Sequence, residues 1–159
     1  MSNETQLKTI VNGIEYNLTV PSRLLASDFL RDNLNLTGTH VGCEHGICGS
    51  CTIKIDGLTA RSCLKFAVQL DGKKVETVEN FQKKKETKNI LKKFKENHSL
   101  QCGFCTPGFL MIIDEMLTKS IKYSENEIRE ALSGNLCRCT GYENIVKAAK
   151  IILGSKKLK

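Results

Sequence analysis

The hydrophobic pattern of the chain changes character once, near Asn80. Before this residue, apolar positions fall in short runs that are separated by turn residues, whereas after it they recur at the three- and four-residue spacing of helices. This pattern predicts an α+β protein. We expect a sheet-containing domain over residues 1–80 and a helical domain over residues 81–159.

The first half predicts strands, one short helix and one long loop. Asn12-Gly13 is a hairpin signal between two strand-like runs. A helix with Ser22 as its N-cap is predicted next, followed by a glycine-rich loop over Gly38–Cys51. Strands are predicted over Leu7–Val11, Ile14–Val20, Thr52–Ile55 and Lys74–Val78.

The second half predicts four helices arranged as two hairpins. Thr106 is expected as an N-cap with Pro107 in the first helical position, and Ser124 begins a capping box that ends at Glu127. Two such hairpins facing each other would make a four-helix bundle. The predicted helices cover Lys88–Glu96, Thr106–Lys119, Ser124–Leu132 and Thr140–Leu153.

Composition excludes several classes of function. The formal charge of +7 would suit nucleic acid, but only 6% of the 159 residues are aromatic and none is Trp, so bases would find few stacking partners. Met1–Thr9 is polar and resembles no secretory signal. The longest apolar run, Phe109–Ile113, is far shorter than the ~20 residues that span a bilayer. We therefore expect a cytoplasmic protein without a membrane span.

Eight cysteines divide into two complete sets of four. An even number of cysteines in a short chain is also the signature of disulfides. In an intracellular protein, however, thiols are more often metal ligands or catalytic groups, which favours two metal sites. The sets are Cys43, Cys48, Cys51 and Cys63, then Cys102, Cys105, Cys137 and Cys139.

The first set has the Cys-x4-Cys-x2-Cys spacing with which plant-type ferredoxins hold a [2Fe–2S] cluster. Gly42, Gly46 and Gly49 lie among these thiols, where they let the backbone adopt unusual dihedral angles and approach inorganic sulfur. An ordinary surface loop would not require three thiols at this spacing. The order of hairpin, helix, cysteine loop and returning strands resembles the β-grasp fold of plant-type ferredoxins.

The second set has a different spacing, Cys-x2-Cys followed after 31 residues by Cys-x-Cys. In both pairs the second cysteine is expected just before a helix, where the positive end of the helix dipole favours thiolates and an anionic cluster. Structural zinc also binds four thiolates, and Cys-x2-Cys is its usual ligand pair. Spacing alone therefore leaves either a [2Fe–2S] cluster or zinc at this site.

Three motifs together resemble the small iron–sulfur subunit of the xanthine oxidase family of molybdenum hydroxylases. They are Gly-Cys-Glu-His-Gly-Ile-Cys-Gly-Ser-Cys from Gly42, Gln-Cys-Gly-Phe-Cys-Thr-Pro-Gly from Gln101, and Asn-Leu-Cys-Arg-Cys-Thr-Gly-Tyr from Asn135. The resemblance covers nearly the whole chain. It implies two [2Fe–2S] clusters, one on each set of cysteines, with the second nearer the molybdenum cofactor. The sequence departs from the family's pattern at His45 and Ser50, where Gly and Ala are frequent in the family, but no ligand is lost.

The same resemblance implies contacts with the molybdenum cofactor. Gln101 looks like the family's glutamine that hydrogen-bonds the pterin, and its amide can both donate and accept at a heterocycle edge. Cys139 would lie against the pterin in addition to binding iron.

By this resemblance the chain would be an electron-transfer subunit with no activity of its own. Electrons would pass from molybdopterin in a large catalytic subunit, through the two clusters, to FAD in a medium subunit of a heterotrimer or to another acceptor. The substrate is set by the large subunit; an aldehyde such as glyceraldehyde is expected, with a purine, carbon monoxide or an aromatic thioester as alternatives. The rival interpretation is a stand-alone binding module with one zinc site.

Overall fold

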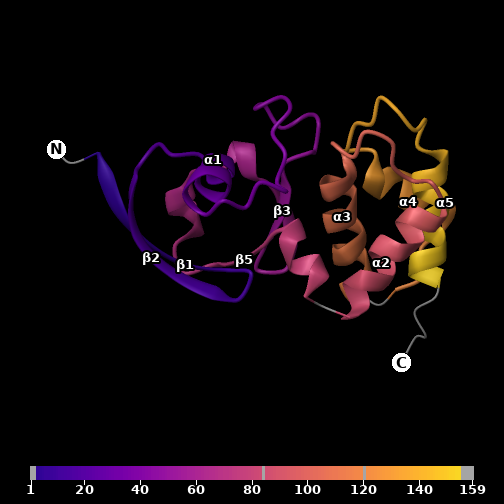
Figure 1. Ribbon diagram of the computed structural model, residues 1–159, viewed down its shortest axis with the longest axis horizontal. Coiled ribbons are helices and arrows are strands. Elements are labelled where there is room, and N and C mark those ends of the chain that lie inside the picture. Colours follow the sequence, from indigo (N-terminus) through magenta and orange to yellow (C-terminus); the bar gives the residue numbers. More distant parts are fainter. Residues whose placement is uncertain (1–2, 84, 120, 155–159) are drawn as a thin grey trace.

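The computed structural model describes residues 3–83, 85–119 and 121–154, and it shows a sheet unit beside a helical unit (Figure 1). The sheet has five strands in the order β2-β1-β5-β3-β4. β1 pairs with β2 in antiparallel fashion and with β5 in parallel, while β3 is antiparallel to both β5 and β4. The strands are β1 (Glu4–Val11), β2 (Ile14–Pro21), β3 (Thr52–Ile55), β4 (Leu58–Arg61) and β5 (Lys74–Glu76).

The α+β fold class is confirmed, but the first half contains a strand that the pattern did not predict. β4 follows β3 through Asp56-Gly57, whose φ angles are 50° and 87°. Positive φ at both central residues is the geometry of a tight hairpin turn, and Asp-Gly is one of its preferred sequences. Strand β4 therefore had a recognisable signal in the sequence.

The predicted N-cap at Ser22 is wrong. Helix α1 (Ala26–Asp28) begins four residues later, with Leu25 as its N-cap, and continues into a wider π-helical turn over Phe29–Asn33. Ser22 and Arg23 form a turn instead, in which the N–H of Leu24 donates to the carbonyl of Pro21 at 3.0 Å. Leu25 is extended and forms an isolated antiparallel bridge with Phe66. Below the helix, a buried apolar cluster fills the space against the sheet; it includes Leu7, Val20, Phe29, Leu30, Ile53, Leu70 and Val75.

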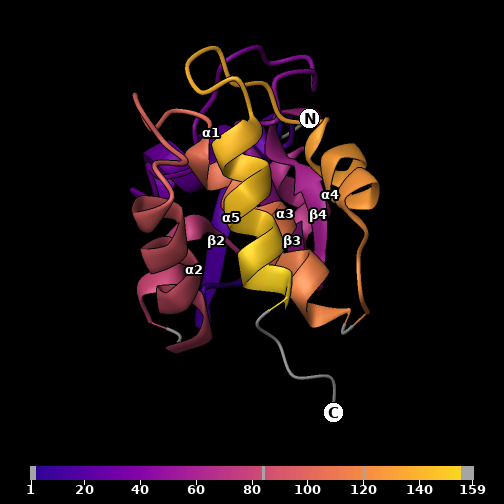
Figure 2. The same cartoon turned by 90° about the vertical axis from the view of Figure 1, so that its right-hand side faces the viewer.

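Four helices form the second unit, as predicted. They are α2 (Lys85–Glu96), α3 (Thr106–Thr118), α4 (Glu125–Leu132) and α5 (Glu143–Gly154). In Figure 2, α5 faces the viewer between α2 and α4, with α3 behind it. The buried residues of α3 include the whole run from Pro107 to Asp114, because this helix contacts strands β3 and β4 as well as the other helices.

The helix termini were predicted with mixed success. The capping box is confirmed, since the N–H of Glu127 donates to Ser124 Oγ at 3.3 Å and the N–H of Ser124 donates to Glu127 Oε2 at 2.7 Å. The N-cap of α3 is Cys105 rather than Thr106. Helix α5 begins at Glu143, since Gly141 and Tyr142 have positive φ and cannot continue a helix. Within the described ranges, no helix is long and apolar enough to cross a bilayer.

Candidate metal centres

The first set of cysteines lies on the loop that precedes β3 and on a short 3₁₀ turn, Ser62–Leu64, that follows β4. Gly46 and Gly49 have φ angles of 85° and 74°, which L side chains rarely adopt, so the predicted need for glycine is confirmed at these two positions. Gly42 serves a different purpose. A Cβ at Gly42 would lie 3.3 Å from Cys48 Sγ and 3.2 Å from Phe104 Cε1, so this residue allows a close approach.

The four thiols of the first set interact in two pairs. The N–H of Cys48 donates to Cys43 Sγ at 3.4 Å, and this bond, with another from the backbone of His45, lowers the pKa of Cys43 to about 6. Burial, followed by a hydrogen bond with Cys51, raises the pKa of Cys63 to about 11. Cys43 also interacts with Cys48 through its side chain. The predicted set is therefore brought together by the fold.

The second set is assembled from two loops at one end of the helical unit. Cys102 and Cys105 precede α3, whereas Cys137 and Cys139 lie between α4 and α5. Cys139 Sγ is 3.5 Å from Cys102 Sγ, and the Cys105 thiol forms a hydrogen bond with the Cys137 thiol. Each contact therefore joins one loop to the other, a pairing that spacing alone did not reveal.

The environments of these four thiols differ. Burial, followed by a hydrogen bond with Cys137, raises the pKa of Cys105 to about 12. Burial opposes ionisation of Cys137 too, but its pKa is lowered because the Thr140 hydroxyl donates to its sulfur at 3.1 Å and backbone groups assist. The hydrogen bond with Cys102 raises the pKa of Cys139. Thr140 is a site residue that the cysteine spacing did not identify, although it lies within the third motif.

The donor set suits a two-iron cluster at each site. All eight cysteines are free thiols, and each set forms two interacting pairs. A [2Fe–2S] cluster takes four thiolates, distributed over two irons, whereas structural zinc takes four around one ion. The paired arrangement therefore fits [2Fe–2S] better than zinc.

A buried amide separates the two cysteine loops. Asn135 is 1% exposed, and neither polar atom of its side chain has a hydrogen-bond partner in this structure. A Cβ at Gly49 would lie 2.0 Å from Asn135 Oδ1, and one at Gly108 would lie 2.4 Å from Asn135 Nδ2. His40 also joins the two loops, because its ring stacks on the ring of Phe104 with their centroids 4.9 Å apart. The motif pattern did not single out these contacts.

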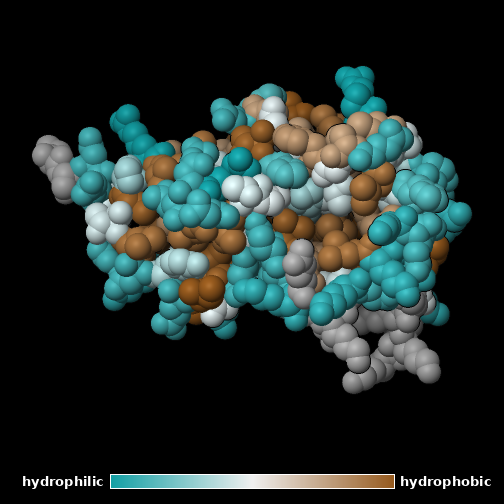
Figure 3. Space-filling model, in the orientation of Figure 1, coloured by the Kyte–Doolittle hydropathy of each residue, from teal (hydrophilic) through white to brown (hydrophobic). Residues whose placement is uncertain are grey.

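Exposed apolar side chains lie beside the cysteine loops. Five exposed large hydrophobic side chains lie within two residues of a cysteine: Ile47, Leu64, Leu100, Phe104 and Leu136. Hydrophobic patches appear among polar ones along the upper edge of the molecule, where these loops lie (Figures 1 and 3). Gln101 is exposed beside Cys102 in the same region. Exposed apolar side chains gathered in this way mark interaction sites.

Two protein families match the chain. The 2Fe-2S iron-sulfur cluster binding domain matches residues 31–99, and the [2Fe-2S] binding domain matches residues 77–150. Caffeine dehydrogenase subunit gamma of Pseudomonas sp. (strain CBB1) is 54% identical over 145 residues, which cover 89% of this chain and 87% of that subunit.

Two further relatives agree with these matches. The xanthine dehydrogenase iron–sulfur-binding subunit of Escherichia coli O157:H7 is 36% identical over 147 residues, which cover 91% of this chain and 92% of that subunit. In the crystal structure of quinoline 2-oxidoreductase from Pseudomonas putida 86, one chain superposes with a TM-score of 0.88 and 42% identity, covering 96% of each chain.

Proposed function

We propose that this chain, which belongs to the iron–sulfur subunits of the xanthine oxidase family of molybdenum hydroxylases, links the molybdenum site of a large catalytic subunit to FAD on a medium subunit. The observation that carries the proposal is the pair of four-cysteine sets on adjacent loops, each within a matched [2Fe–2S] domain. We retain the division into residues 1–80 and 81–159, one cluster-binding unit on each side.

Two ligand sets are proposed. The sheet unit would hold one [2Fe–2S] cluster through Cys43, Cys48, Cys51 and Cys63, and the helical unit would hold another through Cys102, Cys105, Cys137 and Cys139. When bound, each cluster supplies a centre that accepts and returns one electron. The chain's own part is to hold the thiolates. The N–H of Cys48 and the hydroxyl of Thr140 support this role because each donates a hydrogen bond to a ligand sulfur.

We propose that the exposed apolar loops are the docking surface for the large subunit. Gln101 and Cys139 are both exposed there, which supports contacts between them and the pterin of the molybdenum cofactor. Five apolar side chains surround the same loops, and their burial by a partner would favour association. A cytoplasmic location is proposed with this assembly, since eight free thiols need a reducing compartment.

The substrate of the complex is proposed to be a nitrogen heterocycle. The relatives of higher identity are named for caffeine and for nicotine derivatives, at 46–54% identity, and these compounds are nitrogen heterocycles. Purines also belong to this class. An aldehyde is the second candidate, because relatives with 34–38% identity are named aldehyde oxidoreductases.

Purification of the native complex tests the proposal. We expect the chain to co-purify with a molybdopterin-containing large subunit and an FAD-containing subunit, and native mass spectrometry would give their ratio. Substrate bleaching of the cluster absorbance should be faster with purines or pyridines than with aldehydes. The chain expressed alone should turn over neither class. A free chain that oxidises a substrate, or one that purifies without a molybdenum partner, would refute the proposal.

A further inference from the structure

Lys54 is a buried cation at the boundary between the sheet unit and the helical unit. It lies in β3, in a run of apolar and threonine residues, and its side chain is only 3% exposed. A lone charge in such a position is unfavourable unless partners compensate it. The surroundings of Lys54 are therefore informative about what holds the two units together.

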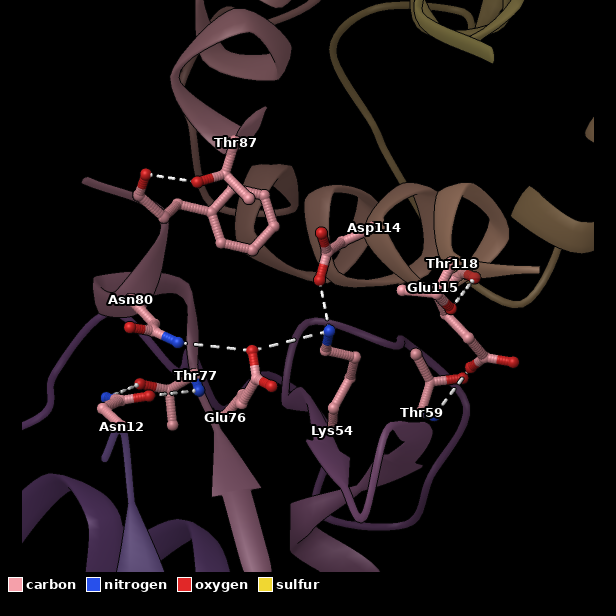
Figure 4. A network of polar contacts seen from close by, with 11 residues as sticks. Asn12, Lys54, Thr59, Glu76, Thr77, Asn80, Thr87, Asp114, Glu115 and Thr118 are labelled. Carbon is pink, nitrogen blue, oxygen red and sulfur yellow. Dashed lines mark hydrogen bonds and ion pairs between the residues drawn. The ribbon is translucent and has the colours of Figure 1, made fainter. Parts of the chain in front are cut away.

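The compensating carboxylates come from both sides of the boundary (Figure 4). Asp114, on α3, forms an ion pair with Lys54 Nζ. Glu76, on β5, places its Oε2 3.5 Å from the same nitrogen and also accepts a hydrogen bond from Asn80 Nδ2 at 3.3 Å. One cation of the sheet unit is thus shared between its own sheet and the central helix of the other unit.

A second polar contact lies one residue further along α3. Glu115 Oε2 accepts a hydrogen bond from the N–H of Thr59, on β4, at 2.7 Å (Figure 4). Lys119 pairs with the same carboxylate at 2.7 Å. A buried charge is strongly destabilising in any alignment that separates it from its partner, so such pairs favour one alignment of the two surfaces. Two adjacent polar contacts therefore fix both the position and the rotation of α3 on the sheet.

Regular secondary structure connects this ion pair to the cysteines. Lys54 follows Cys51 by three residues and lies in β3, while Asp114 lies on the helix that begins directly after Cys105. We propose that Lys54 and Asp114 are positioning residues that fix the two cluster-binding units in one relative orientation, and thereby set the magnetic and electronic coupling between the clusters. This inference rests on the proposed function, because it presumes one cluster in each unit.

Replacement of the ion pair by apolar residues separates positioning from stability. In the purified complex, Lys54→Met alone should lower the melting temperature of the chain by roughly 10 °C, because two carboxylates would face each other without a cation. The double variant Lys54→Met/Asp114→Leu should recover most of that loss, since an apolar pair is tolerated at such sites. Its two units should nevertheless lose their single orientation.

The decisive readout is electron paramagnetic resonance of the dithionite-reduced complex, in which we expect the two reduced clusters to split and relax each other's signals. We expect the double variant to show a changed or broadened interaction with both signals retained. The control is Lys73→Met, since Lys73 and Asp56 form an exposed ion pair of 3.0 Å within the sheet unit, and it should change neither readout.

The outcomes distinguish the inference from the function on which it rests. An interaction in the double variant identical to that of the wild type would overturn the inference, as would a wild type with two signals that do not interact. A wild type with fewer than two cluster signals would instead overturn the proposed function.

Discussion

The backbone carbonyl of Cys48 accepts a hydrogen bond from the N–H of Leu136 at 2.9 Å. Cys48 belongs to the first set of thiols, and Leu136 immediately precedes Cys137 of the second set. The two candidate cluster sites thus share a wall, in which Asn135 fills the space between Gly49 and Gly108. A change in the packing between Gly49, Asn135 and Gly108 should therefore disturb both sites.

Gly49→Ala should damage the shared wall. The alanine would have to adopt the unfavourable φ of 74°, and its methyl group would lie 2.0 Å from Asn135 Oδ1. We therefore expect a loss of more than about 3 kcal/mol in stability, with reduced iron content at both sites. Gly57→Ala is a matched control because its φ is 87° but no atom lies within 4 Å of the added carbon. Equal iron content and melting temperature in the two variants would contradict this role of Gly49.

Single ligand substitutions should act on one centre at a time. Because the two sets lie on separate units, Cys48→Ser should remove one [2Fe–2S] resonance signal and leave the other, and Cys105→Ser should do the reverse. The backbone bond from Leu136 to residue 48 would persist in the serine variant. Electron paramagnetic resonance of the reduced protein provides the measurement. Loss of both signals in each variant would disprove two independently assembled centres.

Removal of one hydroxyl should shift the potential of the second centre alone. The Thr140 hydroxyl donates to Cys137 Sγ at 3.1 Å, and such a bond favours the more negative, reduced form of a cluster. Loss of about 1 kcal/mol in Thr140→Val would lower the potential by roughly 40 mV for one electron. A redox titration followed by resonance would detect this change. Thr118→Val, which removes an exposed hydroxyl from α3, should leave both potentials unchanged.

Gln101→Ala should leave both clusters assembled, because an amide does not bind iron here. The substitution should weaken binding of the pterin or slow the bleaching of the clusters by substrate. The loss of a hydrogen bond worth about 1–3 kcal/mol would lower the affinity or the rate by roughly 5- to 150-fold. Stopped-flow absorbance and molybdopterin content provide the measurements. Gln6→Ala, which removes an amide from the distant strand β1, is the matched control. Wild-type rates and cofactor content in Gln101→Ala would assign the pterin contact to other residues.

Local signals in the sequence predicted much of this fold. The Asn12-Gly13 hairpin signal located β1 and β2, and the capping box at Ser124 located the start of α4, because each depends on residues that are neighbours in the chain. Ser22 was a poor guide for the opposite reason. Ser22 and Arg23 form a turn, and Leu25 is held extended by a bridge with Phe66, which is distant in sequence.

The features that join the two units could not be predicted locally. A lysine in a strand ordinarily indicates a side chain that faces solvent. Lys54 is nevertheless buried, and Asp114, which compensates its charge, lies 60 residues away in the chain. The same reasoning applies to the cysteines. Spacing assigned them to two sets, but the contact between Cys102 and Cys139 depends on how two loops meet in space.

We propose that this one chain holds two [2Fe–2S] clusters on eight cysteines. Metal analysis of the purified chain together with resonance spectroscopy after reduction tests it most directly. We predict about four irons per chain, no stoichiometric zinc, and two distinguishable [2Fe–2S] signals, since the loop of the sheet unit and the helical unit offer different hydrogen bonds and exposure. About two irons with one zinc per chain, and a single signal, would contradict it.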